Sequence, residues 1–169
     1  TSLIAAMLKA AGKKVWLGGN IGTPLLPLCP QMKEEDFAVV ELSSFQLMDM
    51  RRSPHVAVVT NLAPNHLDVH KDMDEYVDAK KNIFAFQGKN DKLILNLDNG
   101  ITNTFIGNGK TRWFSRQGKT DNGICLDGDY ITRDGGHDWT FWQEALPCFL
   151  PYQFYLWQEL RESHYPSFF

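Results

Sequence analysis

Short apolar runs, separated by longer amphipathic stretches, are the main pattern in the first hundred residues. The runs 37–41 and 56–60 are apolar almost throughout, which is typical of strands covered on both faces of a parallel sheet. Two further runs, at 14–17 and 93–96, have the length of short strands. The chain therefore provides four strands of the kind found inside α/β proteins.

Two amphipathic stretches lie between these runs and predict helices. Apolar residues three and four positions apart share one face of the segment 2–11, and Gly12 follows it as a capping residue. The segment 74–86 shows the same spacing and contains Lys80. Because helices and strands alternate, we expect an α/β fold with a doubly wound, mostly parallel sheet.

The pattern changes after residue 100. Short strands punctuated by glycine predict a β-rich edge or small hairpins over 104–133, with Asn108-Gly109 as one turn candidate. From 134 to 169 aromatic residues cluster without the period of a helix or a strand. We expect residues 1–133 to belong to one domain and 134–169 to be an atypical, poorly specified tail, either frame-shifted or disordered.

Composition narrows the class of protein. A hydrophobic content of 43% and a charged content of 22% are ordinary for a globular protein, and the net charge of −3 disfavours a nucleic-acid partner. The three cysteines are widely spaced and suggest neither a disulfide framework nor a metal cluster, which favours a cytoplasmic location. No apolar run has the length of a membrane span, so we expect no membrane partner. The first residue is Thr1, which suggests a fragment.

Polar residues follow two of the apolar runs where each strand is expected to end. Glu41 closes the run 37–41, and His66 comes shortly after 56–60. If these strands are neighbours, a carboxylate and an imidazole lie side by side at the carboxyl edge of the sheet. Mg²⁺ prefers carboxylate, water and phosphate oxygens, and an imidazole can bond a phosphate or a metal-bound water. Each residue alone is more often a solvated or loop-capping group.

Two neighbouring segments could complete such a site. Ser43 and Gln46 offer neutral hydrogen-bonding groups to a polar substrate, although Ser43-Ser44 fits the N-cap of a helix equally well. The glycine-rich segment 18–22 is either a simple turn or a backbone that approaches a ligand closely. It lacks the spacing of a dinucleotide-binding fingerprint, so we exclude that function.

Four segments, in this order and at this spacing, resemble the ATP-binding central domain of the Mur ligases. They are Gly18-Gly-Asn-Ile-Gly22, Glu41-Leu-Ser-Ser-Phe-Gln-Leu47, Asn61-Leu-Ala-Pro-Asn-His-Leu-Asp68 and Tyr76-Val-Asp-Ala-Lys80. The residues after Glu41 resemble the D-glutamate-adding branch. Other Mur ligases and the folylpolyglutamate synthetases differ there, but they stay as alternatives. The resemblance covers residues 1–100 well and extends more loosely to 133.

The resemblance implies roles for individual residues. Glu41 matches a magnesium-binding glutamate, and His66 matches a histidine that helps to hold a second Mg²⁺ near the substrate. Lys80 matches a lysine that becomes carbamylated, which turns a cation into an anion able to support that metal. Lys80 and His66 are thus the implied catalytic residues, and the implied substrate contacts are Asn20, Ser43 and Gln46.

The implied reaction is ATP-driven amide formation in peptidoglycan precursor synthesis. ATP would phosphorylate the carboxylate of UDP-N-acetylmuramoyl-L-alanine, and the amine of D-glutamate would attack the acyl phosphate. The family's Gly-x-x-Gly-Lys-Thr/Ser phosphate loop would lie just before Thr1, so we expect this chain alone to be inactive and a full-length form to be a monomer. The alternative is a non-catalytic binding module that keeps the sheet.

Overall fold

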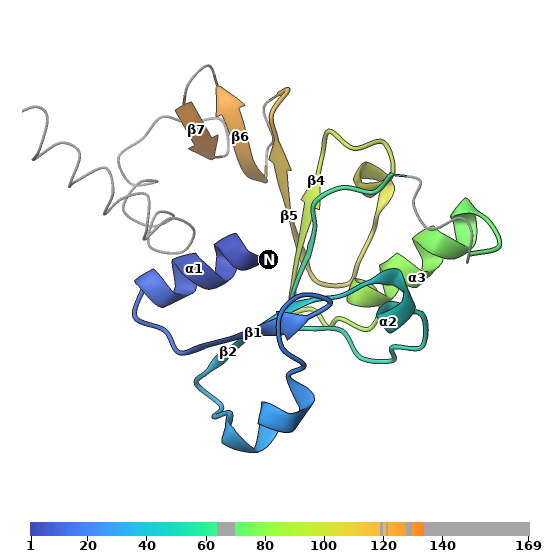
Figure 1. The fold of residues 1–169 in the computed structure, drawn as a ribbon. Helices are drawn as coiled ribbons and strands as arrows, with labels where there is room; N and C mark the ends of the chain where they lie inside the picture. Colours follow the sequence, from blue (N-terminus) through green and yellow to red (C-terminus); the bar gives the residue numbers. More distant parts are fainter. Residues whose placement is uncertain (64–69, 119, 121, 128–129, 134–169) are drawn as a thin grey trace, which may run out of the picture. The chain divides into compact units, whose positions relative to one another are not determined.

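The computed structural model describes residues 1–63, 70–118, 120, 122–127 and 130–133. The described residues fall into two compact units, which meet between Leu42 and Ser43 in the sequence. We call residues 1–42 the first unit and the described residues from Ser43 to Arg133 the second unit. Figure 1 shows the elements of each unit as a ribbon, with most of them labelled.

The first unit consists of one helix, a 3₁₀ helix and two strands. Its elements are α1 (Ser2–Ala10), β1 (Val15–Gly19), η1 (Leu26–Gln31) and β2 (Phe37–Glu41). The strands are parallel and run in register from Val15 opposite Phe37 to Gly19 opposite Glu41. Helix α1 ends where Gly12 adopts a φ of 72°, so this glycine terminates the helix as the sequence predicts.

The second unit is built on a five-stranded sheet. Its elements are α2 (Ser44–Met48), β3 (Val56–Val59), α3 (Met73–Ala85), β4 (Lys92–Asn96), η2 (Thr102–Thr104), β5 (Lys110–Ser115), β6 (Gly123–Asp127) and β7 (Tyr130–Arg133). The strand order is β3-β4-β5-β6-β7, and every neighbouring pair is parallel except the antiparallel pair β6–β7. The predicted α/β class with a mostly parallel sheet is confirmed.

The hydrophobic core of the second unit lies around β4. Leu93 and Leu95 have no exposed surface, and Phe84 of α3 and Phe105 pack in the same cluster. The rings of Phe84 and Phe105 lie 5.3 Å apart. Helix α3 is therefore fixed to the interior strand β4 of the sheet by large apolar side chains.

The burial of β2 differs from the prediction. We expected the run 37–41 to be covered on both faces, but Phe37 is 41% exposed and Val40 is 42% exposed. In the described part of the chain β2 pairs with β1 alone, and β3 belongs to the other sheet. The expected side-by-side placement of the strand ends at Glu41 and Thr60 stays a prediction, because these strands belong to different units.

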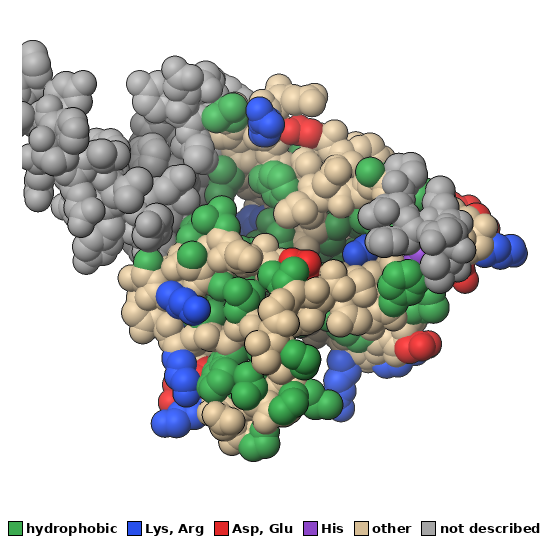
Figure 2. All heavy atoms as spheres, viewed as in Figure 1, with side chains coloured by type: hydrophobic (Ala, Val, Ile, Leu, Met, Phe, Trp, Pro, Cys, Tyr) green, Lys and Arg blue, Asp and Glu red, His purple; other side chains and the backbone are tan. Residues whose placement is uncertain are grey.

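Other expectations are refined. The Asn108-Gly109 dipeptide leads into the parallel strand β5 instead of forming a hairpin turn, and the antiparallel hairpin is β6–β7. The sequence did not predict η1, where Leu26 is 82% exposed; Figure 2 shows hydrophobic side chains at the surface of this region. The tail 134–169 lies outside the described residues. None of the helices in the described ranges is long and apolar enough to cross a membrane.

Candidate functional site

The glycine pair at the end of β1 brings two predicted site residues together. The backbone N–H of Asn20 donates to the carbonyl of Glu41 at 2.8 Å. Gly19 has a φ of 104°, and a Cβ there would lie 2.1 Å from that same carbonyl oxygen. The glycine is therefore required for this close approach of the two strands, while the predicted approach of this backbone to a ligand stays a prediction.

The two residues joined in this way present polar side chains at the carboxyl end of the first unit's sheet. Glu41 is the last residue of β2 and is partly buried, and Asn20 is exposed immediately after β1. The carboxylate supplies hard oxygen atoms, and the amide supplies both a donor and an acceptor. The structure thus brings the backbones of Asn20 and Glu41 together, and their shared role in a site stays a prediction.

In the second unit, Ser43 and Gln46 form a capping box at the start of α2. The Ser43 hydroxyl accepts from the Gln46 backbone N–H at 3.3 Å, and the Gln46 side-chain oxygen accepts from the Ser43 N–H at 2.9 Å. The N-cap interpretation of Ser43 is thus confirmed. Because the cap uses the side-chain oxygen of Gln46, a substrate contact by Gln46 falls to its Nε2 amide group.

Helix α2 has only five residues and is held at both ends by the segment around α3. At its C-terminal end, Asn82 Nδ2 donates to the carbonyls of Leu47 and Met48 at 2.9 and 3.2 Å. At its N-terminal end, Nε2 of His70 lies 2.9 Å from the Ser44 hydroxyl. Isolated helices of this length are unstable, so these contacts position α2.

His70 is a residue that the sequence analysis missed. It is 2% exposed and contacts a serine 26 positions earlier in the chain. A histidine that precedes a helix carries no distinguishing pattern in the sequence. Only the tertiary pairing of α2 with α3 reveals this contact.

Lys80 lies in the middle of α3, and the start of that helix is well defined. Asp72 caps it by accepting from the Glu75 N–H at 2.9 Å. Tyr76, one turn before Lys80, is buried, and this burial raises the pKa of its phenol. The Lys80 Nζ lies 5.9 Å from the centre of the Tyr76 ring, and the residue as a whole is partly exposed.

The structure divides the predicted site residues into two groups. Asn20 and Glu41 are together in the first unit, and Ser43, Gln46 and Lys80 belong to the second. His66 lies outside the described residues, so its predicted role stays a prediction.

A polar network at the carboxyl ends of β3, β4 and β5 was also not predicted. Asn96 donates to the Thr60 carbonyl at 2.9 Å, and Asn99 donates to the Asn61 side chain at 2.6 Å. Asp98 accepts from the Ser115 hydroxyl, and this hydrogen bond is the largest cause of its lowered pKa. The bonds from Asn96 and Asn99 hold the residues that follow β3, because they reach Thr60, Asn61 and the Leu62 carbonyl.

Within the described ranges, no three His, Cys, Asp or Glu residues are grouped so that they could hold a metal ion. Mg²⁺ does not require such a group, because it usually keeps several waters and binds one or two carboxylates with substrate phosphates. The partly buried carboxylate of Glu41, at the end of its strand, fits this type of binding.

Comparisons with known proteins cover most of the chain. The sequence model of the protein family described as the Mur ligase middle domain matches residues 1–132. A Clostridium novyi protein is 56% identical over 133 residues, which cover 78% of this chain and 29% of that protein. An Acetivibrio thermocellus protein is 55% identical over 138 residues, covering 80% of this chain and 30% of that protein. Both relatives are named UDP-N-acetylmuramoylalanine–D-glutamate ligase. The chain thus spans under a third of the length of these relatives, and it belongs to the Mur ligase family through its middle domain.

Proposed function

We propose that this chain is the middle domain of an ATP-dependent ligase that joins D-glutamate to UDP-N-acetylmuramoyl-L-alanine through an acyl phosphate. The observation that supports this most strongly is the 56% identity to a relative named as a D-glutamate ligase. The matched segment includes both strand ends and the whole of α2 and α3. In this proposal the reaction takes place in the cytoplasm, residues 1–133 form the middle domain, and the full-length ligase is a monomer.

Each site residue has a role that follows from its chemistry. Glu41 would hold Mg²⁺ through its carboxylate, and Lys80 and His66 would support a second Mg²⁺. When bound, Mg²⁺ supplies positive charge that neutralises phosphoryl oxygens. Lys80 would act as a carbamate, formed when its neutral amine adds to CO₂ and a proton is released.

The remaining residues would bind and orient the UDP-muramoyl substrate. Asn20 is bonded through its backbone N–H to the Glu41 carbonyl, and its side-chain amide is exposed and able to donate and accept hydrogen bonds. Gln46 Nε2 can donate to a carboxylate or carbonyl of the substrate, with Ser43 beside it. Fixed donors of this kind orient the substrate carboxylate for phosphoryl transfer.

A grafted ligase tests this proposal directly. In it, residues 1–133 of this chain replace the matching segment of the Clostridium novyi protein, which supplies the rest of the enzyme. We expect release of ADP that requires both UDP-N-acetylmuramoyl-L-alanine and D-glutamate. A folded graft without this activity would contradict the proposed function and favour a non-catalytic binding module.

Two variants with matched controls test the site residues in the graft. We expect Lys80→Ala and Glu41→Ala to reduce kcat by at least about 100-fold, the scale seen when charge-stabilising groups are removed. Lys81 is the control for Lys80, because it lies next to it on α3 and pairs with Asp78 at 2.8 Å. Glu35, which is exposed, is the control for Glu41. Equal activities of each variant and its control would contradict the assignment.

A further inference from the structure

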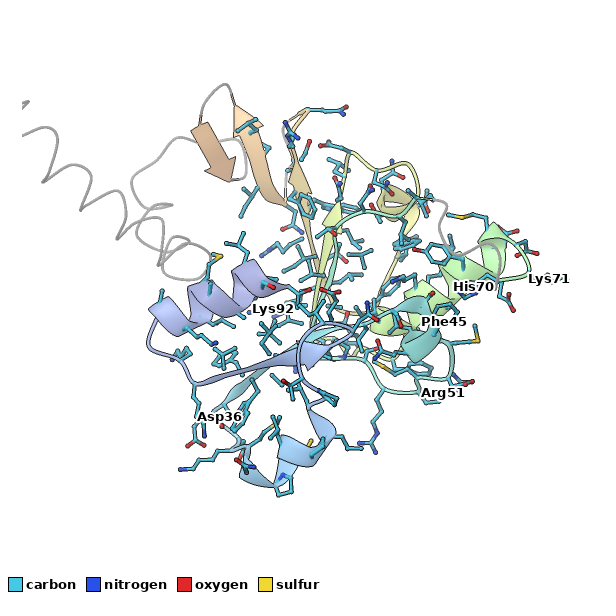
Figure 3. All side chains as sticks on the ribbon, in the orientation of Figure 1. Asp36, Phe45, Arg51, His70, Lys71 and Lys92 are labelled. Carbon is cyan, nitrogen blue, oxygen red and sulfur yellow. The ribbon has the colours of Figure 1, made fainter. Side chains whose placement is uncertain are left out.

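His70 occupies an enclosed position between α2 and α3. Its side chain has no exposed surface, and its ring is stacked on Phe45 of α2, with centroids 5.4 Å apart and planes at 11°. Tyr76 of α3 meets the ring edge-on, also at 5.4 Å. Figure 3 labels His70 and Phe45. Contacts on both sides fix the plane of the imidazole, and therefore the directions of its two nitrogen atoms.

The two nitrogen atoms have different surroundings. Nε2 lies 2.9 Å from the Ser44 hydroxyl, whereas Nδ1 has no hydrogen-bond partner among the residues that the structure describes and faces Glu75 Oε2 at 3.8 Å. A proton on Nδ1 points a donor at a carboxylate and leaves Nε2 to accept from the Ser44 hydroxyl. The other tautomer would leave a buried lone pair facing a carboxylate, which is unfavourable. The surroundings therefore favour the neutral tautomer with its proton on Nδ1.

Ser44, His70 and Glu75 are arranged in the order of a nucleophile, a base and an orienting carboxylate, but the site does not suit nucleophilic catalysis. Ser44 is only 2% exposed, so a substrate carbon cannot approach its hydroxyl. The Glu75 carboxylate is also bonded to the Lys71 backbone N–H at 2.6 Å. The buried hydrogen bond between Ser44 and His70 is therefore better suited to hold two segments of the chain together.

We propose that His70 is a positioning residue, which uses its Nε2–Ser44 hydrogen bond to hold the first turn of α2 against α3. The inference rests on the proposed function, because that turn carries Ser43 and Gln46, the proposed substrate contacts. The capping box closes that turn, and the His70–Ser44 bond connects it to the segment that leads into α3, the helix that carries Lys80. His70 itself does not touch the substrate.

The first experiment uses the 169-residue chain and needs no activity. Long-range ¹H–¹⁵N correlation spectra of its histidines, with His70→Gln to assign the signals, report which nitrogen of His70 carries the proton. We expect a pyrrole-like Nδ1 and a pyridine-like Nε2, and Ser44→Ala should shift the Nε2 signal. A proton on Nε2 would overturn the assigned tautomer, and a signal unaffected by Ser44→Ala would overturn the proposed bond.

The second experiment measures KM in the grafted ligase. His70→Phe keeps an aromatic ring between Phe45 and Tyr76 but removes the acceptor. Loss of one neutral hydrogen bond corresponds to a change of about 2- to 13-fold. We expect KM for UDP-N-acetylmuramoyl-L-alanine to rise by about this factor, with KM for ATP unchanged. His70→Gln can place an amide oxygen near the position that Nε2 occupies, so its KM should be much closer to that of the unchanged graft than the KM of His70→Phe is.

A double variant separates positioning from general damage. His70→Phe combined with Ser44→Ala should be no worse than either change alone, because both remove the same bond. Additive effects, an equal rise in KM for ATP, or an unchanged KM for the muramoyl substrate would each overturn the proposal. Activity of the unmodified graft reports on the proposed function separately.

Discussion

Strands β2 and β4 are both short, apolar and paired in parallel, yet they are buried to very different degrees. In β4, Leu93 and Leu95 are completely enclosed, because the strand has a neighbour on each side and α3 packs on it. In β2, Phe37 and Val40 are more than 40% exposed. The proposed site residues of α2 and α3 thus belong to a well-packed unit. The backbone of Glu41, in contrast, is held by a hydrogen bond from the Asn20 N–H next to Gly19.

The largest expected difference between the two strands is in side-chain truncation. Leu93→Ala should lower the free energy of unfolding of the second unit by about 2–5 kcal/mol, because it opens a cavity beside Phe84. Val40→Ala should lower that of the first unit by less than about 1 kcal/mol, since the side chain is already half exposed. Hydrogen exchange measured by mass spectrometry on peptides from each strand provides both values. Similar losses of unfolding free energy at the two positions would contradict the difference in burial between β2 and β4.

A second expected effect concerns the turn that holds Glu41. Gly19→Ala places a Cβ against the Glu41 carbonyl and strains a positive φ, so it should weaken the first unit by roughly 1–3 kcal/mol. Gly12→Ala is the matched control, because Gly12 also has a positive φ but open space around it. The Asn20 amide should lose exchange protection in Gly19→Ala and keep it in Gly12→Ala. Equal loss in both variants would show that the close approach is unimportant.

The sequence predicted most elements because their signals are local. The period of the apolar residues located α1, α3, β3 and β4 within one or two residues, and Ser43 was identified as an N-cap candidate. The sheet partners of β2 could not be predicted in this way, because a run of apolar residues does not show whether a strand is central or at an edge. The same limit applies to His70, whose partner Ser44 is brought near it only by tertiary packing.

A smaller effect is expected at the cap of α2, where two roles of Ser43 can be separated. Ser43→Ala removes the acceptor for the Gln46 N–H and should destabilise the helix by about 0.5–2 kcal/mol, measured as faster exchange of its amides. Ser43→Asp preserves a capping acceptor and should keep the exchange slow. If Ser43 also contacts the substrate, Ser43→Asp should still raise KM for the muramoyl substrate in the grafted ligase. An unchanged KM would limit Ser43 to its structural role.

The smallest expected effect is a difference in acid sensitivity between the two units. Asp98 in the second unit has a pKa lowered from 3.8 mainly by the Ser115 hydroxyl, and Asp36 in the first has one lowered mainly by the Trp16 indole N–H. Because folding lowers each pKa, each carboxylate stabilises its unit above about pH 4, and that contribution is lost as the pH falls below this value. Protection against hydrogen exchange should fall between about pH 5 and about pH 3, rough limits on either side of an ordinary aspartate pKa. Asp98→Asn should reduce this loss only in β4 and β5. Asp36→Asn should reduce it only in β1 and β2. Both changes should be no more than about a few-fold, the scale of a single net hydrogen bond. Exchange rates corrected for intrinsic chemistry at the two pH values measure them, and an effect of Asp98→Asn on β1 and β2 would show that the two units do not respond separately.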